Sequence, residues 1–158
     1  MQEQLFVLKL ATILGCGLMA GLFFAFSIAV MRALAQLPPS EGIAAMQAIN
    51  VAIVNPLFLV VFIGTAVGCV LVMITSLMGP RSANATYAIA GALTYLFGSL
   101  VVTAVFNIPR NNALAAISST DAASAKVWAS YLSEWTTWNH VRGIAALVAT
   151  ALLAIGLR

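Results

Sequence analysis

Long stretches of this chain carry no charged residue, and that spacing limits the folds it can adopt. Uncharged runs separate Lys9 from Arg32, Glu41 from Arg81, and Arg81 from Arg110. Each run is long enough for the roughly 20 apolar residues that cross a bilayer. The whole chain is 63% hydrophobic and only 7% charged, whereas about a quarter of the residues in a soluble domain are charged. The sequence therefore predicts an integral membrane protein.

Four membrane spans are expected. A fourth uncharged run, residues 143–157, is short, but the helix-favouring segment before it supplies the remaining turns. Pro38-Pro39 ends the first span, Asn55-Pro56 caps and starts the second, and Pro109 ends the third. The prediction is an all-α, integral membrane four-helix bundle, a single domain over residues 1–158, with short interfacial helices in loops 1 and 3. The expected spans are roughly residues 5–36, 56–78, 83–107 and 138–157.

An even number of spans places both chain ends on one side of the membrane and loops 1 and 3 together on the other. The first apolar run is longer than the usual core of a signal peptide, so we expect a retained span. Most polar side chains other than hydroxyls lie in or beside loops 1 and 3, which makes that side the expected location of a site. Lys and Arg near the span ends do not decide the orientation. These polar residues are Asn50, Asn55, Asn107, Asn111, Asn112, Asn139, His140 and Arg142.

The third span carries a polar stripe. Tyr95, Ser99, Thr103 and Asn107 follow one another at spacings of four, which places them along one slowly drifting face of a helix. One interpretation is a polar track from the membrane interior to the loop side. The other is that the hydroxyls bond carbonyls four residues back and that Tyr95 packs between helices. The second interpretation is favoured for Ser99 and Thr103.

The last helix carries an aromatic face that ends in a cation. Its members recur at spacings of three and four, and Asn139 borders them. An interfacial aromatic belt is one interpretation. A flat pocket for a planar ligand, whose oxygen atoms Arg142 and Asn139 would hold, is the other. The face consists of Trp128, Tyr131, Trp135, Trp138 and Arg142.

His140 is the only histidine, and helical spacing directs it away from this aromatic face. A lone histidine is more often structural than catalytic, although histidine is the side chain best suited to proton transfer near neutral pH. One histidine excludes a histidine-rich metal site, and the few carboxylates lack paired-ligand spacing. No basic patch for nucleic acid, phosphate loop, dinucleotide fingerprint or serine-nucleophile motif is present.

Four segments together resemble the anthrone oxygenase-like membrane family, whose bacterial branch is largely uncharacterised. The resemblance covers nearly the whole chain, and the ordered set is specific although each piece alone is weak. The segments are Met46-Gln-Ala-Ile-Asn50, Asn55-Pro-Leu-Phe58, Asn107-Ile-Pro109-x-Asn111-Asn112-x-Leu114 and Trp135-x-x-Trp138-Asn139-His140-Val-Arg142.

The resemblance implies a monooxygenase that oxidises an anthrone to an anthraquinone with O₂ and no familiar redox cofactor. Loss of a proton from the carbon opposite the anthrone carbonyl gives an electron-rich enolate, which can pass an electron to O₂ directly. The protein would supply a base, an oxyanion partner and a dry aromatic pocket.

The resemblance also implies residue roles. His140 would be the base, and Arg142, with Asn107 or Asn139, would stabilise the enolate oxygen. Trp135 and Trp138 would hold the rings. The remaining asparagines would shape the rim of the site or cap helices, and they are Asn50, Asn55, Asn111 and Asn112. Tyr95 is a further candidate for substrate binding.

A second function class remains open: a non-enzymatic membrane protein that binds a small molecule or is associated with its transport. Under both hypotheses the expected partners are the lipid bilayer and a lipophilic small molecule, with no nucleic acid, no metal and no cofactor. The expected location is a bacterial cytoplasmic membrane. Gly17-x-x-x-Gly21 and Gly64-x-x-x-Gly68 would allow close helix approach, either within one subunit or in a homo-oligomer.

Overall fold

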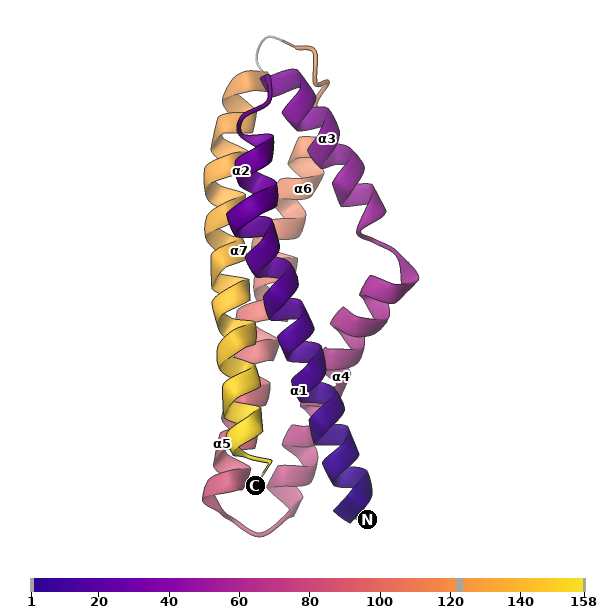
Figure 1. Cartoon of the computed structure of the whole chain (residues 1–158), viewed down its shortest axis with the longest axis vertical. Helices are drawn as coiled ribbons and strands as arrows, with labels where there is room; N and C mark the ends of the chain where they lie inside the picture. Colours follow the sequence, from indigo (N-terminus) through magenta and orange to yellow (C-terminus); the bar gives the residue numbers. More distant parts are fainter. Residues whose placement is uncertain (1, 122–123, 158) are drawn as a thin grey trace.

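The computed structural model describes residues 2–121 and 124–157, and within these ranges it is a helical bundle (Figure 1). Four helices are long and apolar enough to cross a membrane. The first joins α1 (Gln2–Ala25), the π turn η1 (Phe26–Val30) and α2 (Met31–Leu34), and the second is α4 (Pro56–Met78). The third joins α5 (Ala83–Tyr95), the π turns η2 (Leu96–Val101) and η3 (Thr103–Asn107), and α6 (Ile108–Ala115). The fourth is α7 (Ser124–Ile155), and α3 (Pro39–Ala52) lies in loop 1.

Pro109 does not end the third span, contrary to the prediction, because a π turn precedes it. Proline lacks an N–H and crowds the carbonyl four residues earlier. In η3 the Ile108 N–H instead bonds the carbonyl of Thr103, five residues back. This wider turn accommodates the proline ring, so the helix continues to Ala115. The short helix expected in loop 3 is therefore a continuation of the third span.

Small residues set the distances between the spans. A Cβ at Gly68 of α4 would lie 2.5 Å from Thr12 Oγ1 of α1, and a Cβ at Gly91 of α5 would lie 3.0 Å from the Leu153 backbone nitrogen of α7. Gly21 and Gly64 have nothing within 4 Å of such an added atom. Each predicted Gly-x-x-x-Gly pair therefore includes one glycine that no other part of the subunit approaches.

The start of α1 and the end of α7 lie at the same end of the bundle, beside the α4–α5 turn (Figure 1). There the Lys9 ammonium donates to the Gly156 carbonyl at 3.0 Å. At the opposite end α3, α6 and the first half of α7 form a smaller apolar cluster around buried Trp128 and Tyr131. The candidate site lies between this smaller cluster and the end of the bundle that holds the chain ends.

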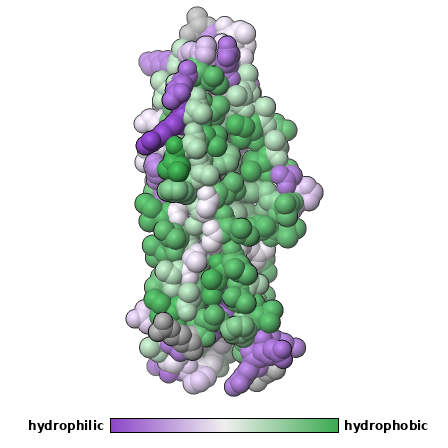
Figure 2. Space-filling model, in the orientation of Figure 1, coloured by the Kyte–Doolittle hydropathy of each residue, from purple (hydrophilic) through white to green (hydrophobic). Residues whose placement is uncertain are grey.

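The visible face carries a hydrophobic belt between two more hydrophilic ends (Figure 2). Large apolar side chains are exposed on the bundle, including Leu18 at 63%, Val60 at 70% and Leu147 at 62%. Exposed apolar surface of this extent suits a lipid environment rather than water. Together with the four long apolar helices, it identifies a multi-pass membrane protein.

Candidate functional site

A cavity of about 280 Å³ lies where η1, α3, α4, α6 and α7 meet. We call it the Arg142 cavity. Aromatic and aliphatic side chains form most of its wall, and a few polar groups converge on it, the combination typical of small-molecule sites. The polar lining residues are Asn50, Thr103, Asn111, Asn139 and Arg142.

Arg142 is a buried cation, only 6% exposed. Its Nη1 donates to Thr103 Oγ1 at 3.2 Å and its Nη2 donates to Asn139 Oδ1 at 2.6 Å. The guanidinium carbon lies 4.4 Å from the centre of the Phe23 ring and 5.2 Å from that of Trp135. Its Nε is buried without a hydrogen-bond partner. These contacts hold the guanidinium in place, but each comes from a neutral group.

No carboxylate balances this charge among residues 2–121 and 124–157. The ion pair found there joins Arg110 to Glu134 at 2.7 Å, away from Arg142. A buried charge without a counter-ion is costly, and such residues in membrane proteins commonly mark functional sites. The Arg142 cavity therefore has the electrostatics of an anion-binding site.

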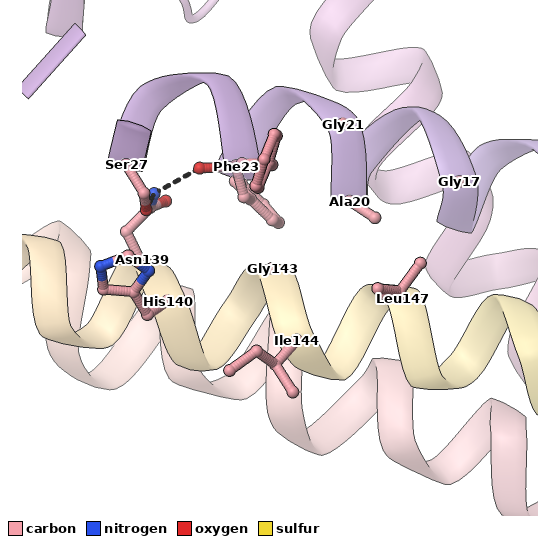
Figure 3. Close-up of a pocket in the computed structure, with 11 residues that line it drawn as sticks. Gly17, Ala20, Gly21, Phe23, Ser27, Asn139, His140, Gly143, Ile144 and Leu147 are labelled. Carbon is pink, nitrogen blue, oxygen red and sulfur yellow. Dashed lines mark hydrogen bonds between the residues drawn. The ribbon is translucent and has the colours of Figure 1, made fainter. Parts of the chain in front are cut away.

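Asn139 joins α7 to the first span. Its Nδ2 donates to the Phe23 carbonyl and to Ser27 Oγ, both at 2.7 Å (Figure 3). Its Oδ1 accepts from Arg142. The Phe23 carbonyl lies just before η1, where the Met31 N–H bonds Phe26 five residues back. Asn139 is fully buried and thus fixes both the helix pair and the Arg142 side chain.

The polar stripe of the third span reaches Arg142. In an α-helix residues four apart drift past one full turn, whereas a π turn holds more residues per turn and keeps them on one face. Thr103 Oγ1 donates to the Ser99 carbonyl at 2.7 Å while accepting from Arg142. The second interpretation is therefore confirmed for Thr103, which also contacts Arg142. It is wrong for Ser99, whose buried hydroxyl has no hydrogen-bond partner among the described residues. Asn107 is buried and donates to the Trp135 carbonyl at 3.3 Å, but its Oδ1 has no partner.

The loop-side wall of the cavity is ordered by Asn111. Its Oδ1 accepts from the Tyr131 hydroxyl at 2.9 Å and from Trp135 Nε1 at 2.8 Å. Asn50 of α3 donates to the same Tyr131 hydroxyl at 3.5 Å. These bonds orient the Trp135 ring, which lines the cavity beside Arg142. A rigid aromatic wall next to a cation suits a planar ligand with an oxygen substituent.

His140 and Trp138 do not line the Arg142 cavity. His140 is exposed and lies along an outer groove between α1 and α7. Trp138 stacks on Phe106, with ring centres 3.5 Å apart. The position of His140 follows from the helical spacing, since residue 140 faces away from residues 135, 139 and 142. Trp138 was expected on the face of Trp135 and Arg142, and its stacking on Phe106 is a correction to that prediction. His140 is not positioned as a base for a ligand beside Arg142. The prediction that the two residues act in one site is therefore wrong for this cavity.

Four other predicted residues contribute elsewhere. Asn55 caps α4 by accepting from the Phe58 N–H at 3.0 Å, which confirms the predicted helix cap. The Tyr95 hydroxyl donates to the Phe62 carbonyl at 3.2 Å within the bundle core. Asn112 is exposed. These three residues and Asn107 do not line the cavity.

The sequence did not predict the phenylalanine side chains of the cavity wall. Phe23 and Phe26 of the first span and Phe58 and Phe62 of α4 all line the cavity. In a chain so rich in apolar residues, no pattern separates a ring that faces a cavity from one that faces lipid. The Phe-rich segment Phe23–Phe26 was the available signal.

The described residues include no group of three His, Cys, Asp or Glu side chains that could hold a metal ion. The polar groups of the Arg142 cavity are amides, one hydroxyl and one guanidinium. Groups of these kinds bind the oxygen atoms of a ligand through hydrogen bonds, and the guanidinium adds charge.

Comparison with known proteins gives one family. The family model for anthrone oxygenase matches residues 52–152, from the end of α3 to near the end of α7. The match includes Thr103, Asn111, Trp135, Asn139 and Arg142. No curated protein and no solved structure matches the chain.

Proposed function

The chain belongs to the anthrone oxygenase family, and on that premise we propose that it is a membrane-embedded oxygenase acting on a lipophilic, enolisable aromatic with O₂. The observation that carries the proposal is the Arg142 guanidinium, which has no carboxylate counter-ion among the described residues and no hydrogen-bond partner for its Nε, in an aromatic-walled cavity. An enolate oxygen is the counter-ion that this cation lacks. Binding the anion more tightly than the neutral ketone favours the form that reacts with O₂.

The proposed reaction balances without a further redox partner. An anthrone loses the proton at the carbon opposite its carbonyl, and the enolate charge moves onto oxygen beside Arg142. The carbanion carbon then transfers an electron to O₂ and combines with it. One oxygen atom remains as the new carbonyl and the other leaves as water, so anthrone and O₂ give anthraquinone and water.

Arg142 supplies the stabilising charge in this scheme, and Thr103 and Asn139 hold it in position through the hydrogen bonds described above. Trp135 provides a flat wall for the rings. Among residues 2–121 and 124–157, no histidine or carboxylate lines the cavity. The chain's contribution is therefore to favour ionisation, and the proton passes to water at the membrane interface. This assignment replaces the expected role of His140.

The cavity suits a compact planar molecule. Its volume of about 280 Å³ is just below the usual range for small-molecule sites. Exposed apolar residues of loop 1 and early α4, such as Val54 and Leu59, line its outer side. A lipophilic substrate can therefore approach from the bilayer rather than from water.

The direct test incubates purified protein with an anthrone in air and follows quinone absorbance and O₂ consumption. Arg142→Gln should lower turnover roughly 10²- to 10³-fold, the usual effect of removing an oxyanion-stabilising donor. Equal turnover by wild type and Arg142→Gln would contradict the proposal. Ligand binding by wild type with no quinone formed would favour the alternative, a non-enzymatic binding or transport-associated protein that uses the same cation.

We further propose a bacterial cytoplasmic membrane as the location, with both chain ends on the same side. The proximity of Lys9 to Gly156 at one end of the bundle supports the second point. The proposed partners are the bilayer and the lipophilic substrate, with no resident cofactor. A homo-oligomer is a further proposal.

A further inference from the structure

We propose that the outer groove between α1 and α7 is a binding site for one anionic phospholipid, distinct from the Arg142 cavity although Phe23 and Asn139 line both. The groove has a volume of about 640 Å³ (Figure 3). Gly17, Gly21 and Gly143 leave its floor low, and the exposed side chains of Phe24 and Leu147 lie along it. This shape suits an acyl chain.

The groove becomes polar at one end. A second hollow of about 210 Å³ shares Ser27 and His140 with it and adds Thr136 and Arg32. A phosphate there would meet a guanidinium, an imidazole and hydroxyl groups. These are the donors that phosphates bind, and arginine is the residue type best suited to them.

Arg32 has no competing partner among the residues that the structure describes. It is exposed and makes no hydrogen bond or ion pair with any residue in the described ranges. The one described ion pair uses Arg110 and Glu134. The charge of Arg32 is therefore available to an anionic headgroup, and this complementarity selects an anionic lipid over a zwitterionic one.

The length of the groove along the helix axis matches the thickness of one leaflet of a bilayer. Gly17 and Ser27 are ten residues apart on the first span, or about 15 Å along a helix, which is half of a hydrocarbon core roughly 30 Å thick. The polar end of the groove also lies at the level where the second span begins, because Asn139 and the first residues of α4 line the same Arg142 cavity. Headgroup and chain would thus be in register with the surrounding lipids.

Native mass spectrometry of the detergent-solubilised protein tests this proposal. The probes are phosphatidylglycerol and phosphatidylcholine with identical acyl chains. Wild type should retain phosphatidylglycerol in preference. Arg32→Gln should weaken that binding about fivefold, the effect of one basic residue beside anionic lipid. Arg81→Gln, in the turn at the opposite end of the bundle, should change nothing.

A second pair of variants tests the acyl-chain groove. Gly21→Leu should weaken binding of both lipids because leucine would occupy the groove, and a Cβ there meets no other atom of the protein. Gly64→Leu places the same side chain on α4, where a Cβ is equally free, and should bind as wild type does.

Equal retention of the two lipids by wild type would overturn the proposal. Equal binding by Gly21→Leu and Gly64→Leu would also overturn it. Conversion of a dimer to a monomer by Gly21→Leu, without loss of lipid, would identify the groove as a subunit interface instead. Quinone formation enters none of these measurements, so the proposal stands or falls independently of the oxygenase function.

Discussion

Asn139 is the residue on which the site and the bundle both depend. It donates to the Phe23 carbonyl and Ser27 Oγ and accepts from Arg142, so its loss would leave two or three buried polar groups unsatisfied. Each such group costs roughly 1–3 kcal/mol. Helical spacing placed Asn139 beside Arg142, but its bonds to the first span depend on helix packing and could not be predicted.

Asn139→Ala should therefore lower the free energy of unfolding by about 2–6 kcal/mol, an estimate for two newly unpaired groups. Thermal unfolding in one detergent, followed by circular dichroism, measures the change. Asn112→Ala removes an amide from an exposed position and serves as the control. Similar losses for the two variants would argue against the assigned role of Asn139.

Substitutions of His140 and Trp135 should differ in their effect on quinone formation. Since His140 is exposed outside the cavity and Trp135 lines it, His140→Gln should keep quinone formation within about twofold of wild type. Trp135→Leu removes both an aromatic wall and a donor to Asn111 and should lower turnover at least about tenfold, since such hydrogen bonds and rings each contribute on the order of 1 kcal/mol. Steady-state rates decide the matter, and a large loss in His140→Gln would restore histidine as the base.

At the scale of elements, the sequence predicts the spans better than their inner geometry. Long uncharged runs and the Asn55-Pro56 cap are local signals, and the structure contains the predicted all-α bundle with α4 starting at Pro56. The π turns are not local signals. Pro109 read alone ends a helix, whereas η3 carries the helix past it and places Asn111 beside Trp135.

The contact between α5 and α7 depends on Gly91. A Cβ at this position would lie 3.0 Å from the Leu153 nitrogen and 3.1 Å from the Ala149 carbonyl oxygen, and backbone atoms cannot rotate away. Gly91→Ala should destabilise the bundle by about 1–3 kcal/mol, as overpacking usually does.

Gly64→Ala is the matched control for Gly91→Ala because its added Cβ meets no other atom. It should leave stability unchanged or raise it by up to roughly 1 kcal/mol through helix propensity. Thermal unfolding of both proteins in the same detergent gives the comparison. An equal or larger loss in Gly64→Ala would mean that the α5–α7 contact is looser than described.

At the scale of the whole molecule, the two ends of the bundle should face opposite aqueous compartments. Gln36→Cys lies beyond α2, and Arg81→Cys lies in the turn near the chain ends. In sealed vesicles, a membrane-impermeant maleimide should label one of these from outside and the other only after permeabilisation. The native Cys16 and Cys69 are both fully buried and should remain unlabelled. Labelling of both introduced cysteines from one side would contradict the four-span topology.

The central claim is that Arg142 is a buried cation that the ligand neutralises. Its most direct test is binding of anthracene-9-carboxylate against 9-anthracenemethanol, followed by tryptophan fluorescence quenching. Wild type and Thr103→Asn should bind the carboxylate at least about tenfold more tightly, as expected for a charge-assisted hydrogen bond. Thr103→Asp places a carboxylate where Thr103 now accepts from Arg142, and it should abolish that preference. Equal affinity of wild type for the two compounds, or an unchanged preference in Thr103→Asp, would contradict the claim.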